Sequence, residues 1–137
     1  MATLSAFLHP EAPENQEVYI SDRFKDEEGK PVPFIIRPVT EEESAAIRRQ
    51  AMVPKRDKRG EKEFDANRYT RLFVIAGTVQ PDFKAADLCE AYGVVSPELV
   101  PGKMLLAGEY ARLSEAISEL GGITDEAAAA VRDEAKN

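Results

Sequence analysis

The chain has 137 residues and a formal net charge of −7, values that suit one globular domain and argue against a general affinity for nucleic acid. Its single cysteine excludes an intrachain disulfide, and its longest apolar run, residues 72–77, is far too short to span a bilayer. The first residues lack the basic and apolar regions of a signal peptide, so we expect a protein of a reducing cytosol without a membrane partner.

Residues 1–16 are predicted to form a flexible arm, because they combine two prolines with several polar residues. Leu4, Phe7 and Leu8 could nevertheless form one short helical turn that packs on a surface. His9 is the only histidine and has no neighbouring cysteine, histidine or aspartate, so we expect it to be solvated rather than a metal ligand.

A β-hairpin is predicted over residues 17–39, where two stretches rich in β-branched and aromatic residues flank the turn sequence DEEGK. Gly29 in this turn can adopt a positive φ. Pro31, Pro33 and Pro38 cannot donate hydrogen bonds to a neighbouring strand, so the second strand is predicted to be an edge strand or to pair on one side only. Such an edge could recruit a strand of a partner, or the prolines could prevent this.

A helix is predicted to begin after Thr40, because Thr40 and Glu43 have the spacing of a capping box. Acidic residues at its start and Arg48 and Arg49 near its end suit the helix dipole. The helix is expected to run to about Met52. The residues predicted to face inward are Ala46, Ile47 and Gln50.

The next segment, residues 53–64, is predicted to be a basic loop. Between positions 48 and 62 the chain carries seven basic and two acidic residues, a net charge of +5, which leaves about −12 for the rest. A solvated loop and a contact with an acidic partner protein are both compatible with this pattern. Nucleic-acid contact is disfavoured because no aromatic residues are interleaved. The candidate partner-binding residues are Arg48, Arg49, Lys55, Arg56, Lys58, Arg59 and Lys62.

Two further helices are predicted before position 95. Asp65 can cap the first, although its run LFVIAGTV is also typical of a strand, and Pro81 ends the element. Phe83 is predicted to lie in the core, and a short helix over residues 84–92 should end at Gly93. The inward-facing residues are predicted to be Tyr69, Leu72, Phe73 and Ala76 in the first helix and Leu88, Cys89 and Tyr92 in the second.

The longest helix is predicted over residues 96–122, with an interruption at Pro101 and a main part from about Lys103. Its apolar residues are spaced alternately four and three apart and therefore lie in one stripe. The stripe is interpreted as core packing, and a groove for a partner helix is the alternative. The stripe consists of Leu106, Tyr110, Leu113, Ile117 and Leu120. Residues 123–137 are predicted to be a frayed or disordered tail.

The sequence contains no recognisable catalytic motif: no glycine-rich phosphate loop, no metal-ligand spacing and no nucleophile elbow. Cys89 has no histidine near it in sequence and is interpreted as a small buried hydrophobic residue. We therefore expect neither enzymatic activity nor a cofactor. The residues alone predict an α+β domain over residues 17–122, with one N-terminal hairpin packed on a mainly helical body of about four helices, that binds another protein.

Four stretches of the chain indicate a more specific function, because their motifs and order match those of a known family. They are ISDRFKDEEGKPVPFIIRPVTEEE, FDANRYTRLFVIAGTVQPDF, DLCEAYG and VPGKMLLAGEYARLSEAISELGG. Together they resemble the XkdN-like family of phage tail assembly chaperones, found in phages and prophages of Gram-positive bacteria. The resemblance covers about residues 18–122.

The resemblance implies a non-catalytic protein of the host cytoplasm that binds the tape measure protein, assists the assembly of tail tube protein around it and is absent from the mature virion. A tape measure protein exposes long apolar helical faces that would aggregate unless covered. Two alternatives remain, a structural tail completion or terminator protein and a small regulatory protein that binds nucleic acid. A ribosomal frameshift near Lys136 could also produce a longer form, or the end could be an ordinary terminus.

Overall fold

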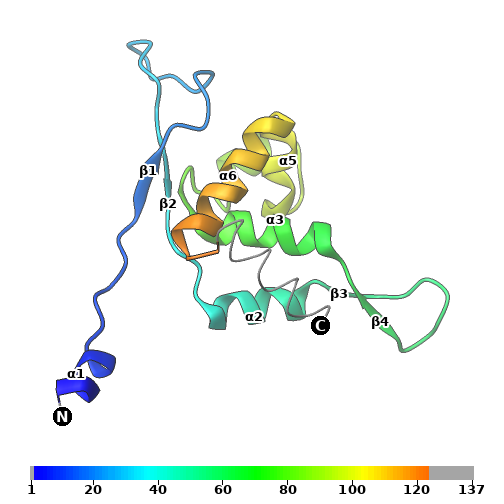
Figure 1. The fold of residues 1–137 in the computed structure, drawn as a ribbon. Helices are drawn as coiled ribbons and strands as arrows, with labels where there is room; N and C mark the ends of the chain where they lie inside the picture. Colours follow the sequence, from blue (N-terminus) through cyan, green and yellow to red (C-terminus); the bar gives the residue numbers. More distant parts are fainter. Residues whose placement is uncertain (1, 124–137) are drawn as a thin grey trace.

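The computed structural model describes residues 2–123 and confirms the predicted α+β class, with an N-terminal hairpin packed on a helical body (Figure 1). Within these residues the body contains five α-helices, α2 to α6, where about four were predicted. The elements are α1 (Ala2–Leu8), β1 (Gln16–Val18), β2 (Phe34–Ile36), α2 (Glu41–Gln50), β3 (Met52–Pro54), β4 (Lys62–Phe64), α3 (Ala66–Gly77), β5 (Thr78–Gln80), α4 (Ala86–Ala91), the 3-10 helix η1 (Pro97–Leu99), α5 (Val100–Met104) and α6 (Ala107–Leu120).

The hairpin belongs to a three-stranded antiparallel sheet in the order β1-β2-β5. Strand β2 pairs with β1 through Val18 opposite Phe34, and with β5 through Ile36 opposite Thr78. The prediction that the second strand pairs on one side only is therefore wrong. Pro33 and Pro38 lie outside the three paired residues of β2, so this strand keeps the donors that both neighbours need.

The two strands of the hairpin are shorter than predicted, and residues 19–33 connect them. A turn lies within this connection, where Lys25 and Pro31 form an isolated antiparallel bridge. Gly29 has φ +84°, and the carboxylate of Asp26 accepts hydrogen bonds from the backbone N–H groups of Glu28 and Lys30 at 2.8 and 3.0 Å. The predicted turn is thus confirmed at the tip of a longer connection.

The local signals for α2 and α3 are confirmed. Thr40 Oγ1 accepts from Glu43 N at 3.1 Å, and a Glu43 carboxylate oxygen accepts from Thr40 N at 3.2 Å, which completes the capping box. Asp65 caps α3 by accepting from Arg68 N at 3.0 Å. The ambiguous run after Leu72 is helix up to Gly77 and strand thereafter. Of the inward-facing residues predicted for α2, Ile47 is buried but Gln50 is exposed.

The predicted long helix is divided into η1, α5 and α6. The break before the main helix lies at Leu105 and Leu106 rather than at Pro101, because Pro101 occupies the first turn of α5, where no N–H is needed. Leu105 is consequently buried and Leu106 exposed, so the first position of the predicted stripe is wrong. The core interpretation is confirmed for Leu113 and Ile117.

The core forms where the hairpin, α3 and α6 meet. Phe34 and Ile36 of β2 pack with Phe73 and Val74 of α3 and with side chains of α6. Phe83 is buried there as predicted. Partly buried side chains cover this cluster, and they include Tyr69, Leu88, Cys89, Tyr92, Tyr110 and Leu120. Because the hairpin shares one core with α3 and α6, it should unfold together with them.

Gly77→Ala is expected to reduce the free energy of unfolding by about 1–3 kcal/mol, the usual cost of overpacking a core. A Cβ atom at Gly77 would lie 2.4 Å from Ile117 Cγ2, and Ile117 is itself fully buried. Gly108→Ala is the control, since its nearest neighbour is the end of the Arg112 side chain at 3.6 Å. Urea unfolding of both variants measures the difference; equal stability of the two would contradict the close packing of α3 on α6.

The N-terminal helix α1 does not pack on the body (Figure 1). The short helical turn considered as an alternative for this arm is present as α1, but Leu4, Phe7 and Leu8 remain 61, 77 and 63% exposed, so the packing on a surface that this alternative included is not observed. His9 is exposed as predicted. The tail and the frameshift site predicted beyond position 123 lie outside the described residues.

Candidate functional site

The predicted basic loop contains a second, two-stranded antiparallel sheet, which we call the basic hairpin (residues 52–64). Strand β3 pairs with β4 through Met52 opposite Phe64 and Pro54 opposite Lys62. Lys55 N donates to Glu61 O at 3.0 Å, and Gly60 has φ +81°, as the reversal of the chain requires. Figure 1 shows this hairpin extending away from the helices, next to the C-terminal end of α2.

Most of the candidate basic residues are exposed on this hairpin and the adjoining end of α2. Arg48 lies back along α2, where it contacts Glu41 at 2.6 Å and donates to Ser44 at 3.1 Å. Lys55 lies 3.5 Å from Glu61 on the opposite side of the hairpin loop. For the other five candidates, the structure records no ion pair within residues 2–123. These five are Arg49, Arg56, Lys58, Arg59 and Lys62.

Exposed apolar side chains lie at the base of the basic hairpin. Met52 and Phe64 are 38 and 49% exposed, and they oppose each other in the strand register. The Phe64 ring also lies 5.8 Å from that of Tyr69. The sequence did not predict that Met52 and Phe64 lie together, since its only indication was one apolar residue on either side of a turn. The hairpin therefore presents an apolar base together with a basic tip, a combination that suits a protein partner.

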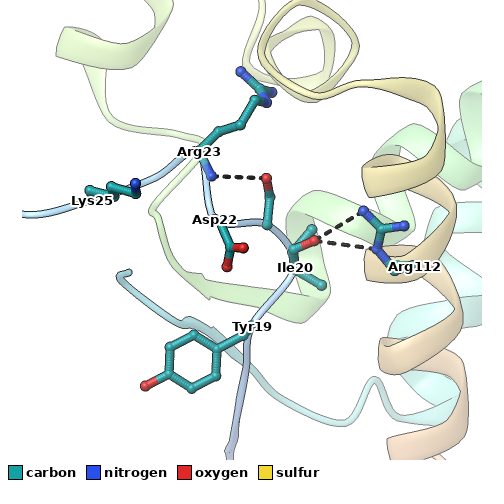
Figure 2. Close-up of a pocket in the computed structure, with 7 residues that line it drawn as sticks. Tyr19, Ile20, Asp22, Arg23, Lys25 and Arg112 are labelled. Atoms are coloured by element: carbon teal, nitrogen blue, oxygen red, sulfur yellow. Dashed lines mark hydrogen bonds between the residues drawn. The ribbon is translucent and has the colours of Figure 1, made fainter. Parts of the chain in front are cut away.

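A second open site is a cavity of 590 Å³ beside the connection between β1 and β2 (Figure 2). It is lined by residues 19–23, Lys25 and Arg112. Arg112 of α6 donates from Nε and Nη2 to the carbonyl oxygen of Ile20, at 3.3 and 3.2 Å. This arginine is thus engaged in holding the connection against α6.

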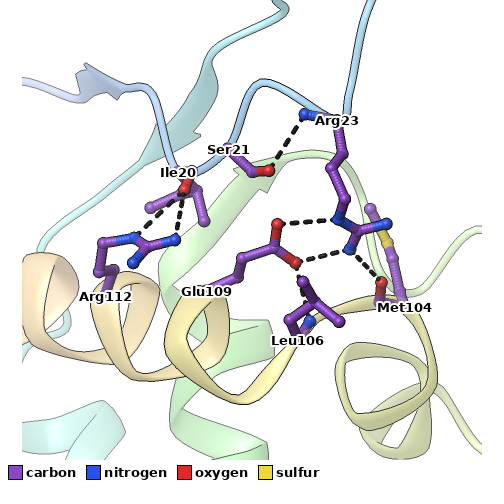
Figure 3. Close-up of polar contacts among 7 residues, drawn as sticks. All are labelled: Ile20, Ser21, Arg23, Met104, Leu106, Glu109 and Arg112. Atoms are coloured by element: carbon purple, nitrogen blue, oxygen red, sulfur yellow. Dashed lines mark hydrogen bonds and ion pairs between the residues drawn. The ribbon is translucent and has the colours of Figure 1, made fainter.

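The neighbouring pair, Arg23 and Glu109, fixes the same connection more firmly (Figure 3). Arg23 donates from Nε and Nη2 to the two carboxylate oxygens of Glu109, at 3.0 and 2.6 Å, and from Nη2 to Met104 O at 3.1 Å. Glu109 also accepts from Leu106 N at 2.7 Å, where α6 begins. These hydrogen bonds, above all those from Arg23, lower the pKa of Glu109 from 4.5 to about 2. The pair is a structural junction between the hairpin and α6.

Residues 2–123 contain no group of three or more histidine, cysteine, aspartate or glutamate side chains arranged to hold a metal ion. Cys89 is partly buried against the core, as predicted for a hydrophobic residue. Among the described helices, none combines the length and the apolar character needed to cross a membrane.

Comparison with known proteins agrees with the resemblance seen in the motifs. Residues 4–136 match the family described as phage XkdN-like tail assembly chaperone protein. The phage-like element PBSX protein XkdN of Bacillus subtilis (strain 168) is 34% identical over 139 residues, covering 98% of this chain and 93% of XkdN. The uncharacterised protein YqbN of the same organism is 38% identical over 116 residues, covering 82% of this chain and 78% of YqbN.

The fold of this chain is also similar to that of a relative, YqbN. The crystal structure of YqbN matches this chain with a TM-score of 0.72 and 32% identity, covering 85% of this chain and 94% of the YqbN chain. The family match spans the hairpin, the basic hairpin and all the helices of the body. The chain therefore belongs to the XkdN-like family of phage tail assembly chaperones.

Proposed function

We propose that this protein binds the tape measure protein of a phage tail and assists the assembly of tail tube protein around it, without catalysing a reaction. The observation that supports this most is the family match over nearly the whole chain, residues 4–136. A tail assembly chaperone has to cover apolar partner surfaces temporarily, and long helical proteins expose such surfaces before assembly.

The basic hairpin is the surface that we propose for the partner. Its tip carries Arg56, Lys58 and Arg59, which are exposed, and its base carries Met52 and Phe64. Exposed positive charges increase the association rate with an acidic partner, and the apolar base adds buried area on contact. Partner segments that alternate acidic and apolar residues would therefore bind here.

The proposed role also sets where the protein acts and how strongly it binds. It acts in the host cytoplasm and is absent from the mature virion, because the tail tube has to replace it on the tape measure protein. Each contact should consequently be weak, and several copies on one tape measure protein should act together. A chaperone that bound with very slow dissociation would block the tube subunits.

Co-expression with the tape measure protein is expected to raise the soluble yield of the latter and to lead to co-purification. The variant Arg56→Glu/Lys58→Glu/Arg59→Glu, which reverses the charge of the hairpin tip, is expected to lose most of this effect. These side chains are exposed, so the variant should remain folded. The measurement is the soluble fraction of tape measure protein, together with circular dichroism of the variant.

The matched control is Lys25→Glu/Lys30→Glu/Lys84→Glu, which makes the same change in net charge at three other exposed sites. It should retain the effect on solubility. A wild-type protein that neither solubilises nor co-purifies with the tape measure protein would contradict the proposed role. Detection of the protein in purified virions would favour a tail completion or terminator protein, and steeply salt-dependent binding to DNA would favour a nucleic-acid-binding regulator.

A further inference from the structure

Helix α1 lacks the packing that a helix of its length needs. Isolated helices shorter than about 12–15 residues are marginal in water, and α1 has seven residues. Leu4, Phe7 and Leu8 have the i, i+3, i+4 spacing that places them on one face, and all three are exposed. Figure 1 shows α1 at the far end of the arm from α5 and α6. Its apolar face is therefore available to another surface.

A groove of matching size lies between α3, α5 and α6. Its volume is 480 Å³, enough for more than one large side chain. Asn67, Thr70 and Arg71 line it from α3, again with i, i+3, i+4 spacing, and Leu105 and Tyr110 contribute apolar surface from the other side. Grooves between helices commonly bind an amphipathic helix through residues at i, i+3 and i+4.

A cluster with an excess of positive charge lies beside the groove and shares Arg71 with the groove lining. Arg68 and Arg71 share the single carboxylate of Glu98, at 3.5 and 3.6 Å. Both Nε atoms are buried and make no hydrogen bond within the part of the chain that the structure describes. Two guanidinium groups and one carboxylate leave a net positive charge, which favours an incoming carboxylate. Burial raises the pKa of Tyr110, so its hydroxyl stays protonated and can donate a hydrogen bond to such a carboxylate.

The arm that carries α1 has the opposite charge. It contains Glu11, Glu14 and Glu17, and the chain has no lysine or arginine before Arg23. Glu11 follows Leu8 by three residues, close enough to reach the edge of a groove that holds Leu8. The arm thus combines apolar residues at helical spacing with a carboxylate just beyond them. The groove combines an apolar lining with Arg71, which belongs to the adjacent, net positive cluster of Arg68, Arg71 and Glu98.

We propose that α1 of a second copy of this chain binds in the groove between α3 and α6. Leu4, Phe7 and Leu8 contact the apolar lining, and Glu11 lies near Arg71. Each copy has both an arm and a groove, so reciprocal exchange closes a symmetric dimer and buries both apolar faces. This self-association does not depend on the proposed contact of the basic hairpin with a partner.

Sedimentation velocity of the full chain over a range of concentrations tests the proposal. The wild-type protein should form dimers, and Phe7→Asp should raise the dissociation constant at least about tenfold, since it removes a central apolar contact. Glu11→Lys should raise it too, because it places a positive charge beside Arg71. Val95→Asp, at an exposed apolar residue outside both surfaces, is the matched control and should leave the dissociation constant unchanged.

A complementation experiment tests the groove itself. Ala107 is exposed and lines the groove, so Ala107→Trp should block it without disturbing the core and should abolish the dimer. A mixture of the Phe7→Asp and Ala107→Trp variants retains one intact arm and one intact groove, and it should form a mixed dimer. A monomeric wild-type protein, a dimer unaffected by Phe7→Asp, or a mixture without mixed dimers would each overturn the proposal.

Discussion

Leu113→Asp is expected to abolish the folded state of this protein. Leu113 is 0% exposed and lies in the middle of α6, within the core cluster that joins the hairpin to α3. An unpaired carboxylate in such an environment costs several kcal/mol, which is comparable to the whole stability of a domain. The variant should be insoluble, or should lack near-ultraviolet circular dichroism and cooperative unfolding.

Leu106→Asp is the matched control for this prediction. It is the same substitution in the same predicted stripe, but Leu106 is 60% exposed and occupies the N-cap position of α6. Aspartate is favoured at an N-cap because its side chain can accept from free backbone N–H groups. This variant should therefore fold and unfold cooperatively. If Leu113→Asp were instead folded and monomeric but unable to bind a partner, the stripe would be a binding surface rather than core.

The contrast between these two leucines illustrates what the sequence could predict about the fold. Features set by neighbouring residues were predicted correctly, such as the capping box of α2 and the turn at Gly29. Periodicity placed Leu113 and Ile117 in the core, because it depends only on the geometry of a helix. The same periodicity misplaced Leu106, since it does not reveal that the chain is extended at Leu105.

Contacts between distant residues could not be predicted in the same way. The pairing of β2 with β5 joins segments about forty residues apart, and a three-residue strand next to a helix gives almost no period-two signal. Arg23 and Glu109 are separated by 86 residues, and neither has a distinctive sequence neighbourhood. For the candidate site, the charge of the basic hairpin followed from composition, whereas the apposition of Met52 and Phe64 required the strand register.

The Arg23–Glu109 pair should make this protein sensitive to acid. Glu109 is buried, with 2% of its surface exposed. Hydrogen bonds, mainly from Arg23, lower the pKa of its carboxyl group from 4.5 to about 2. The unfolded chain binds this proton more readily than the folded one, so stability rises with pH in this range. The contribution of Glu109 is fully present above pH 4.5 and is lost as the pH falls towards 2.

Glu43 adds to this pH dependence of stability, because its pKa is also lowered to about 2, chiefly by its hydrogen bonds with Arg37. Glu109→Gln should therefore reduce the pH dependence without removing it. Glutamine keeps the shape of the side chain but does not titrate, and it forms a weaker contact with the arginine. The variant should be less stable than the wild type at pH 7, and the difference should shrink as the pH falls to 3.

Urea unfolding at several pH values between 7 and 3 measures this difference. Glu119→Gln, at an exposed position of the same helix, is the control and should follow the wild-type curve. Arg23→Gln should reduce the stability at pH 7 more than Glu109→Gln does, because it leaves the buried Glu109 carboxylate without its arginine. The double variant should lose less stability than the sum of the two single losses, because both single variants lose the same interaction. If the free energy of unfolding depended on pH in the same way for Glu109→Gln and the wild type, the connection of the hairpin would be held against α6 mainly by apolar packing.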